Sequence, residues 1–155
     1  MSEITSKIIE ANGAKELILE GFLNESADLT FMSQLPQGKI LVNSKDLKRI
    51  NSCGVREWIT ALKTVPATSE LIFVQCSAAF LDQINMISNF TGNGKVKSLY
   101  ATYACSECKA KKEVLIDLDS CLKNDELNLP EETCSACNKP MEFGDDPASI
   151  FGFLE

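Results

Sequence analysis

The chain has 155 residues, of which 45% are hydrophobic and 24% charged, and its formal net charge at pH 7 is −7. This is the composition of an ordinary globular protein, and its acidic balance disfavours nucleic-acid binding, which normally begins with a basic patch. Histidine is absent, which excludes Ser-His-Asp triads, Cys-His dyads and histidine metal ligands.

The first residues, Met1-Ser2-Glu3-Ile4, lack the basic segment followed by an apolar run that marks a secretory signal. No apolar run in the chain approaches the length that spans a bilayer. We therefore expect a cytoplasmic protein. Its seven cysteines then indicate metal ligation rather than disulfides, because thiols in that compartment are kept reduced.

Residues 5–23 are predicted to form a β-hairpin. Two apolar segments, Lys7 to Glu10 and Leu17 to Glu20, flank Asn12-Gly13, the pair that best accepts the left-handed backbone of a two-residue turn. A short helix should follow and end before Pro36. The apolar side chains of that helix are Leu29, Phe31, Met32 and Leu35.

The stretch from Lys39 to Leu62 is predicted to fold as a strand, a polar connection and a helix. Ile40-Leu41-Val42 is a short apolar run typical of a buried strand, and the polar connection runs from Asn43 to Arg49. The helix should begin at Asn51-Ser52-Cys53-Gly54, whose small polar side chains suit a cap. Residues at spacings of three and four form its apolar face: Val55, Trp58, Ile59, Leu62 and Val65.

A second buried strand, Leu71 to Val74, is followed by a helix that Ser77 should cap and that should end by Asn89. A last strand, Val96 to Tyr103, runs toward Cys105. The order is then β-β-α-β-α-β-α-β, which implies parallel crossovers with an antiparallel hairpin at one edge. The predicted fold class is therefore α/β with a mixed β-sheet.

The turn at residues 51–54 resembles a motif of the STAS domain, a family shared by anti-sigma factor antagonists and sulfate transporters. The family reads a buried strand, a polar connection and then Asp-Ser-Ser-Gly or Asp-Ser-Thr-Gly opening a helix. Ser52 and Gly54 are kept here, whereas Asn51 replaces the Asp and Cys53 replaces the second hydroxyl residue. The resemblance covers about residues 4–100 and implies a STAS-like sheet with helices.

The resemblance also implies a function. In the antagonists a serine of this motif is phosphorylated by a partner kinase, and phosphorylation switches off binding, so Ser52 is the candidate phosphorylation site. The implied partner is a protein such as an anti-sigma factor or a signalling kinase. The surface that would meet it consists of Asn51, Ser52, Cys53, Gly54 and Arg56.

Two CxxC pairs, Cys105/Cys108 and Cys134/Cys137, stand in the last third of the chain. Two such pairs can make a tetrahedral four-cysteine site, and the pattern resembles a zinc ribbon with structural zinc. A dithiol redox pair and iron–sulfur ligation are the alternatives. The 25 residues between the pairs exceed the roughly 15 to 20 that are usual. Asn138 tolerates the left-handed backbone that such turns often need, whereas Lys109 has no such advantage.

Three further cysteines lie outside the two pairs. Cys76 ends a buried strand and is most simply a small hydrophobe. Cys121 falls in the acidic stretch Asp117 to Glu132, which is predicted to be a solvated loop. Cys53 stands at a helix N-terminus, where a lowered thiol pKa would suit an oxidant sensor.

The chain therefore divides into three predicted parts. Residues 1–100 form a STAS-like domain, residues 101–145 a zinc-ribbon-like subdomain with four cysteine ligands, and residues 146–155 an apolar C-terminal turn or short helix. No Gly/Pro/Ser linker precedes Cys105, so the ribbon should be held rigidly on the preceding strand.

Two further expectations concern the end of the chain. Met141-Glu142-Phe143 should pair with the ribbon hairpin, and Asp145-Asp146-Pro147 should begin the last helical turn. That turn is too apolar to be a solvated tail, and we expect it to pack within the protein rather than to serve a partner.

These features favour a non-enzymatic regulatory module that binds a protein partner and carries a structural zinc ribbon. One alternative is a nucleic-acid- or transcription-associated zinc-ribbon protein, which the acidic charge disfavours. Another is a thiol-based redox sensor acting through Cys53. An enzyme has the least support, because no nucleophile–base set and no phosphate-binding glycine loop is recognisable.

Overall fold

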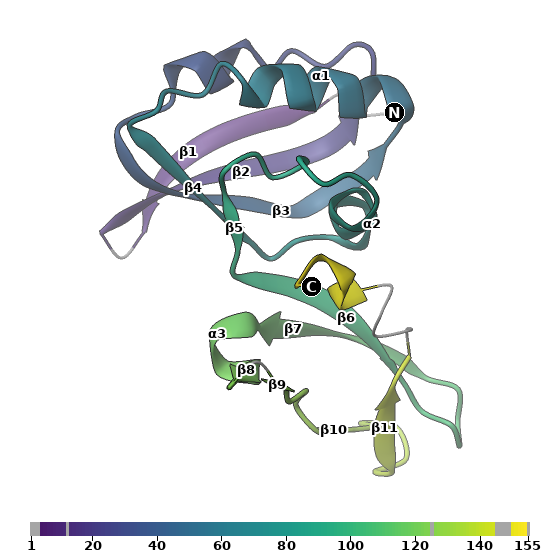
Figure 1. Cartoon of the computed structure of the whole chain (residues 1–155). Coiled ribbons are helices and arrows are strands. Elements are labelled where there is room, and N and C mark those ends of the chain that lie inside the picture. Colours follow the sequence, from purple (N-terminus) through teal and green to yellow (C-terminus); the bar gives the residue numbers. More distant parts are fainter. Residues whose placement is uncertain (1–3, 12, 125, 145–149, 155) are drawn as a thin grey trace.

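A computed structural model describes residues 4–11, 13–124, 126–144 and 150–154. Two larger β-sheets, one above the other in Figure 1, are joined by a continuous piece of chain, and a third sheet in the described ranges has only two short strands. Three α-helices and two short 3-10 helices accompany these sheets in the described ranges, so the fold is mixed α/β, as predicted. None of the described helices combines the length and the apolar character needed to cross a membrane.

The first sheet has five strands in the order β1-β2-β3-β4-β5. β1 and β2 form the predicted antiparallel hairpin, in which Ala11 pairs with Ala14 and Gly13 has a φ of 79°. β2, β3, β4 and β5 are mutually parallel, which confirms the predicted crossovers. The elements of this part are β1 (Thr5–Ala11), β2 (Ala14–Leu23), η1 (Thr30–Gln34), β3 (Gly38–Ile50), α1 (Ser52–Leu62), β4 (Ser69–Val74), α2 (Ala78–Met86) and β5 (Lys95–Val96).

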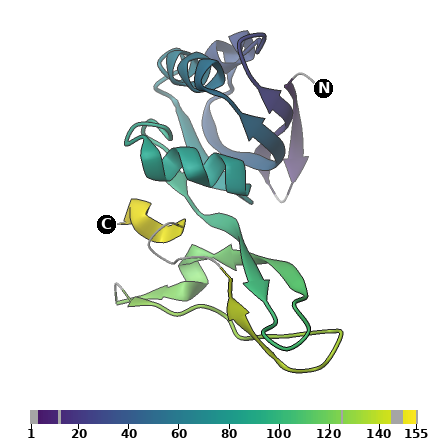
Figure 2. The same cartoon turned by 90° about the vertical axis from the view of Figure 1, so that its right-hand side faces the viewer.

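The core of this part lies between one face of the sheet and the helices α1 and α2. Trp58 of α1 meets Phe80 of α2 edge to face, with ring centroids 5.7 Å apart, and both rings contact Phe73 of β4. The indole N–H of Trp58 donates to the carbonyl of Phe90 at 2.7 Å, so its polar edge is satisfied inside the core. Both helices therefore cover the same face of the sheet, as Figure 2 shows.

The polar connection predicted from Asn43 to Arg49 is wrong, because these residues continue β3 to Ile50. A β-bulge at Ser44-Lys45 shifts the register against β2, and beyond it Leu47 is fully buried. The Ser77 hydroxyl caps α2 as predicted and also donates to the Leu47 carbonyl at 2.8 Å. Pairing with β2 and the bond from Ser77 thus provide hydrogen-bond partners for the backbone of a segment whose sequence suggests a loop.

Three other element predictions need correction. The helix before Pro36 is only the 3-10 turn η1, although Met32 within it is fully buried. α1 ends at Leu62, before Val65. The single strand predicted from Val96 to Tyr103 is interrupted at Lys97, whose N–H donates to the Phe73 carbonyl at 2.7 Å. The two pieces belong to different sheets.

The second sheet is antiparallel and has the order β10-β11-β6-β7. β6 is tied to the first sheet, since Leu99 forms a parallel bridge with Cys76. The stretch predicted as a solvated loop between β7 and β10 is partly ordered as a helical turn and a small hairpin, and Leu118 and Cys121 within it are buried. The elements are β6 (Ser98–Ala104), β7 (Lys111–Asp117), α3 (Leu118–Cys121), β8 (Leu122–Lys123), β9 (Glu126–Leu127), β10 (Glu132–Thr133), β11 (Pro140–Phe143) and η2 (Gly152–Leu154).

Residues 150–154 pack within the protein, as expected, and the surface that they cover belongs to α2. Ile150 and Phe151 are buried, and Figures 1 and 2 both place this yellow segment between α2 and the second sheet. The pairing predicted for residues 141–143 is also confirmed, because β11 pairs with β6. The cap predicted at Asp145-Asp146-Pro147 lies outside the described residues.

Candidate metal centre

The first CxxC pair forms a tight turn at the end of β6. The N–H of Lys109 donates to the carbonyl of Cys105 at 3.0 Å, and the N–H of Cys105 donates to the carbonyl of Ala110 at 2.8 Å. These two bonds fold the turn so that Cys105 and Cys108 face the same point.

The second pair repeats this pattern between β10 and β11. The N–H of Asn138 donates to the Cys134 carbonyl and the N–H of Cys134 donates to the Lys139 carbonyl, each at 2.8 Å. Asn138 has the expected left-handed backbone, with a φ of 60°, but Lys109 has the same conformation, with a φ of 65°. The turn geometry therefore outweighs the residue preference at Lys109, at a cost of about 1 kcal/mol.

The four sulfurs lie within 4.8 Å of one another. The Sγ atoms of Cys105 and Cys137 are 3.4 Å apart, and those of Cys108 and Cys134 are 3.5 Å apart. Four thiolates at about 2.3 Å from one zinc ion would be about 3.8 Å from each other. The donor set therefore fits a tetrahedral metal ion, and the structure brings together the four predicted ligands.

Backbone N–H groups are directed at the first sulfur of each turn. The N–H of Cys137, together with that of Ala136, lowers the pKa of Cys134 to about 7. The N–H of Cys108 is the main cause of the lowered pKa of Cys105. Such donors stabilise the thiolate, the form that binds a metal.

The second thiol of the later pair behaves differently. The N–H of Lys139 lowers the pKa of Cys137, but the neighbouring thiols outweigh it and raise the value to about 12. Four thiolates so close together repel one another unless a cation lies among them. The cluster is therefore suited to a divalent metal ion.

Short strands hold the two turns together. β11 pairs with β6 just before Cys105, through Glu142 and Ala104, and with β10 just before Cys134. Lys112 and Glu132 form an ion pair at 2.7 Å beside this junction. The long gap between the cysteine pairs is accounted for by β7, α3 and the β8–β9 hairpin, which occupy it.

The remaining cysteines are not part of this cluster. Cys76 is buried where β4 ends, and Cys121 is buried in α3, where desolvation and the charge of Asp117 raise its thiol pKa. Cys53 is exposed in the first turn of α1.

The predicted partner surface is the turn between β3 and α1. Asn51, not Ser52, caps the helix: its side-chain oxygen accepts from the Gly54 N–H at 2.8 Å, and Ser52 is the first helical residue. Ser52, Cys53 and Arg56 are exposed. Gly54 is buried beneath them, so it supports this surface from within.

Sequence reasoning missed Glu25 in the same turn. Its carboxylate accepts from the side-chain amide of Asn51 at 3.0 Å, and the hydrogen bonds of its own backbone N–H and of Asn51 lower its pKa. A carboxylate thus stands beside the N-terminus of α1, where its negative charge is favourable. No local signal connects residues 25 and 51, because β2 and β3 bring them together.

Comparison of the sequence with protein-family models and with curated proteins finds no match.

Proposed function

We propose that this protein is a non-enzymatic regulatory module that binds a protein partner through the β3–α1 turn and is braced by a structural zinc ribbon. The observation that carries the proposal is the convergence of four thiols on one point. Four protein ligands close the coordination sphere and leave no open position for a substrate, as in structural zinc sites.

Bound zinc would cross-link the two cysteine turns. The residues that would hold it are Cys105, Cys108, Cys134 and Cys137. β10 and β11, the strands on either side of the second cysteine turn, are only two and four residues long, so metal binding would supply much of the free energy that orders this turn. This argument favours a structural role over a catalytic one.

Metal analysis of protein purified without added zinc tests this part of the proposal. We expect one equivalent of zinc and no iron, because four-cysteine sites of ribbon type select zinc through tetrahedral thiolate ligation. Cys53→Ser, which changes an exposed cysteine outside the cluster, should retain the full equivalent. Less than half an equivalent of zinc, or bound iron, would contradict the assignment.

The partner surface is supported by exposure and by the family resemblance of the turn. Ser52 and Cys53 project from the first turn of a helix, where Asn51 already satisfies the Gly54 N–H. The Ser52 hydroxyl is therefore not needed as the cap. We propose that Ser52 lies in the surface contacted by a partner of the kind that binds STAS antagonists, an anti-sigma factor or a signalling kinase, where added charge rather than loss of the hydroxyl would disrupt binding.

Binding to a recovered partner, measured by calorimetry, tests the role of the turn. Ser52→Asp should weaken the complex tenfold or more, about 1.4 kcal/mol, because a carboxylate would be buried unpaired against the partner. Ser52→Ala should be nearly neutral, and Ser88→Asp, which adds the same charge beyond α2, is the matched control. Equal affinity of Ser52→Asp and the parent would place the partner surface elsewhere.

A further inference from the structure

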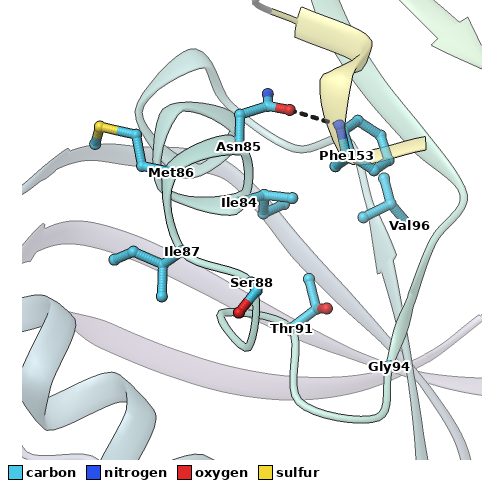
Figure 3. A pocket seen from close by; sticks show the side chains of 9 residues that line it. All are labelled: Ile84, Asn85, Met86, Ile87, Ser88, Thr91, Gly94, Val96 and Phe153. Carbon is cyan, nitrogen blue, oxygen red and sulfur yellow. Dashed lines mark hydrogen bonds between the residues drawn. The ribbon is translucent and has the colours of Figure 1, made fainter. Parts of the chain in front are cut away.

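The C-terminal segment, defined as residues 150–154, is fastened to α2 by one side chain. The amide of Asn85 donates to the carbonyl of Ile150 at 3.0 Å, and its oxygen accepts from the N–H of Phe153 at 2.8 Å. The same amide nitrogen also donates to the Leu81 carbonyl at 3.1 Å, which fixes its orientation. Asn85 therefore holds the segment on both sides of Phe151. Figure 3 shows the bond to Phe153 as a dashed line.

Side-chain packing completes this attachment. Ile150 and Phe151 are 9% and 6% exposed, so the segment removes apolar surface from water. Beside it lies an open cavity of about 470 Å³, in which Phe153 forms one wall together with Ile84 and Val96 (Figure 3). Docking of the segment thus shapes the surface of α2 on this side.

The other side of the segment contacts the ribbon. The Phe151 ring meets Phe143 edge to face at 5.8 Å, and Phe143 lies 5.8 Å from the ring of Tyr103. Phe143 ends β11, the strand that follows the second cysteine turn, and Tyr103 lies on β6 just before the first one. These ring contacts therefore link β6 and β11, the strands next to the cysteine turns, to the segment that Asn85 holds on α2.

Phe143 lies on a short strand next to both cysteine turns. β11 is held by a few pairs with β6 and β10, and each of those strands leads directly into a cysteine turn. If a bound metal leaves, repulsion between the thiolates would loosen both turns, because the short strands β10 and β11 hold them only weakly. Phe143 then loses the fixed place against which Phe151 packs.

We propose that metal binding at the cysteine cluster and docking of the C-terminal segment on α2 stabilise each other, so that metal occupancy controls whether this face of α2 is covered. The inference rests on the proposed metal site and goes beyond a structural role for it. Because linkage is reciprocal, releasing the segment must weaken metal binding by the same factor that metal loss weakens docking.

The effect of segment docking on metal binding gives the sharper experiment. Asn85→Ala removes both bonds to the segment from a residue on α2, outside the ribbon. Zinc affinity, measured by competition with a chromogenic chelator, should fall by at least about fivefold, the lower end of common coupling factors. Asp82→Ala, an exposed substitution on the same helix, should leave zinc affinity unchanged.

The forward direction uses hydrogen exchange on the full chain. Stripping zinc with a chelator should speed exchange at residues 150–154, while β3 and β4 keep their protection. Phe151→Ala offers a second route if Asn85→Ala does not fold, as judged by the emission of Trp58, and it should likewise lower zinc affinity. These variants leave all four cysteines in place.

Two results would overturn the proposal. One leaves the proposed metal site standing, and the other contradicts that site as well. If Asn85→Ala and Phe151→Ala both fold and bind zinc as tightly as the parent, the segment and the metal are independent, but the zinc ribbon stands. If the parent protein binds no metal when zinc is supplied, the proposed metal centre is wrong, and the proposed coupling is wrong with it.

Discussion

Gly54 carries a constraint that is visible only at the scale of single atoms. A Cβ at this position would lie 2.0 Å from the carbonyl oxygen of Leu23 and 2.4 Å from its carbonyl carbon. The end of β2 therefore approaches the first turn of α1 so closely that only glycine fits. The glycine of the turn motif is explained by packing, independently of any partner.

Gly54→Ala should lower the free energy of unfolding by about 2–3 kcal/mol, because backbone on both sides must move apart. Urea denaturation followed through the emission of Trp58 measures the change. Cys53→Ala alters the exposed neighbouring residue and should stay within about 0.5 kcal/mol of the parent. A Gly54→Ala protein as stable as the parent would contradict the close approach.

The buried thiol of Cys76 should make the free energy of unfolding depend on pH in the alkaline range. Burial raises the pKa of its thiol from the usual 9.0 to about 12. The folded protein holds the neutral form, so this contribution to stability is complete below pH 9 and is lost as the pH rises from 9 toward 12. The expected slope is about 1.4 kcal/mol per pH unit.

Denaturation curves at pH 8, 9 and 10 check this prediction through a comparison of slopes. Cys76→Ala should lose less stability between pH 9 and 10 than the parent does, whatever its stability at pH 8. Parallel losses in parent and Cys76→Ala would show that other groups cause the alkaline destabilisation.

At the scale of elements, β3 determines how the first sheet is built. Its first half lies between β2 and β4, whereas beyond the bulge it pairs with β2 alone. Leu47 in this second half is fully buried, while Lys48 beside it is exposed. The buried side chain of Leu47 thus holds the second half of β3 against the core. The charged residues around it make this segment look like a loop in the sequence.

Leu47→Ala should therefore lower the free energy of unfolding by about 3 kcal/mol, the cost of a cavity in a packed core. Lys48→Ala, its neighbour in the same strand, should change it by less than about 0.5 kcal/mol. Urea midpoints of the two variants give the comparison. Similar midpoints would mean that the second half of β3 contributes little to the core.

At the scale of the whole molecule, two sheets of different construction share the chain. The first has a large apolar core around Trp58, Phe73 and Phe80, whereas the strands on either side of the second cysteine turn, β10 and β11, are only two and four residues long. Leu99 and Cys76 tie the second to the first. The two parts should therefore respond differently when a metal ligand is removed.

Cys137→Ser should loosen residues 101–144 while the first sheet stays folded, because it removes one ligand of the proposed metal but leaves the core around Trp58 untouched. Faster amide exchange confined to the ribbon and residues 150–154, with unchanged Trp58 emission, is the expected result. Cys53→Ser serves as the control. Global unfolding of Cys137→Ser would show instead that the two sheets fold as one unit.

The features determined by the sequence itself are those with short-range physical causes. Asn12-Gly13 predicts the hairpin because its backbone accepts the turn, and Ser77 predicts the start of α2 because its side chain caps the helix. Each CxxC spacing brings two sulfurs to one side of a turn, so the four clustered cysteines could be named without a structure. These signals act over a few residues, and each can be read from the sequence alone.

The features decided only by the tertiary structure depend on residues far apart in the chain. The length of β3 requires pairing with β2 and the bond from Ser77, and the need for glycine at position 54 comes from Leu23. In the sequence, nothing distinguishes Asn85 from other polar residues of a helix. Its hydrogen bonds to residues 150 and 153 form only when the chain is folded. Such contacts leave no local periodicity or turn signal, because their energy arises only when the sheets and helices pack together.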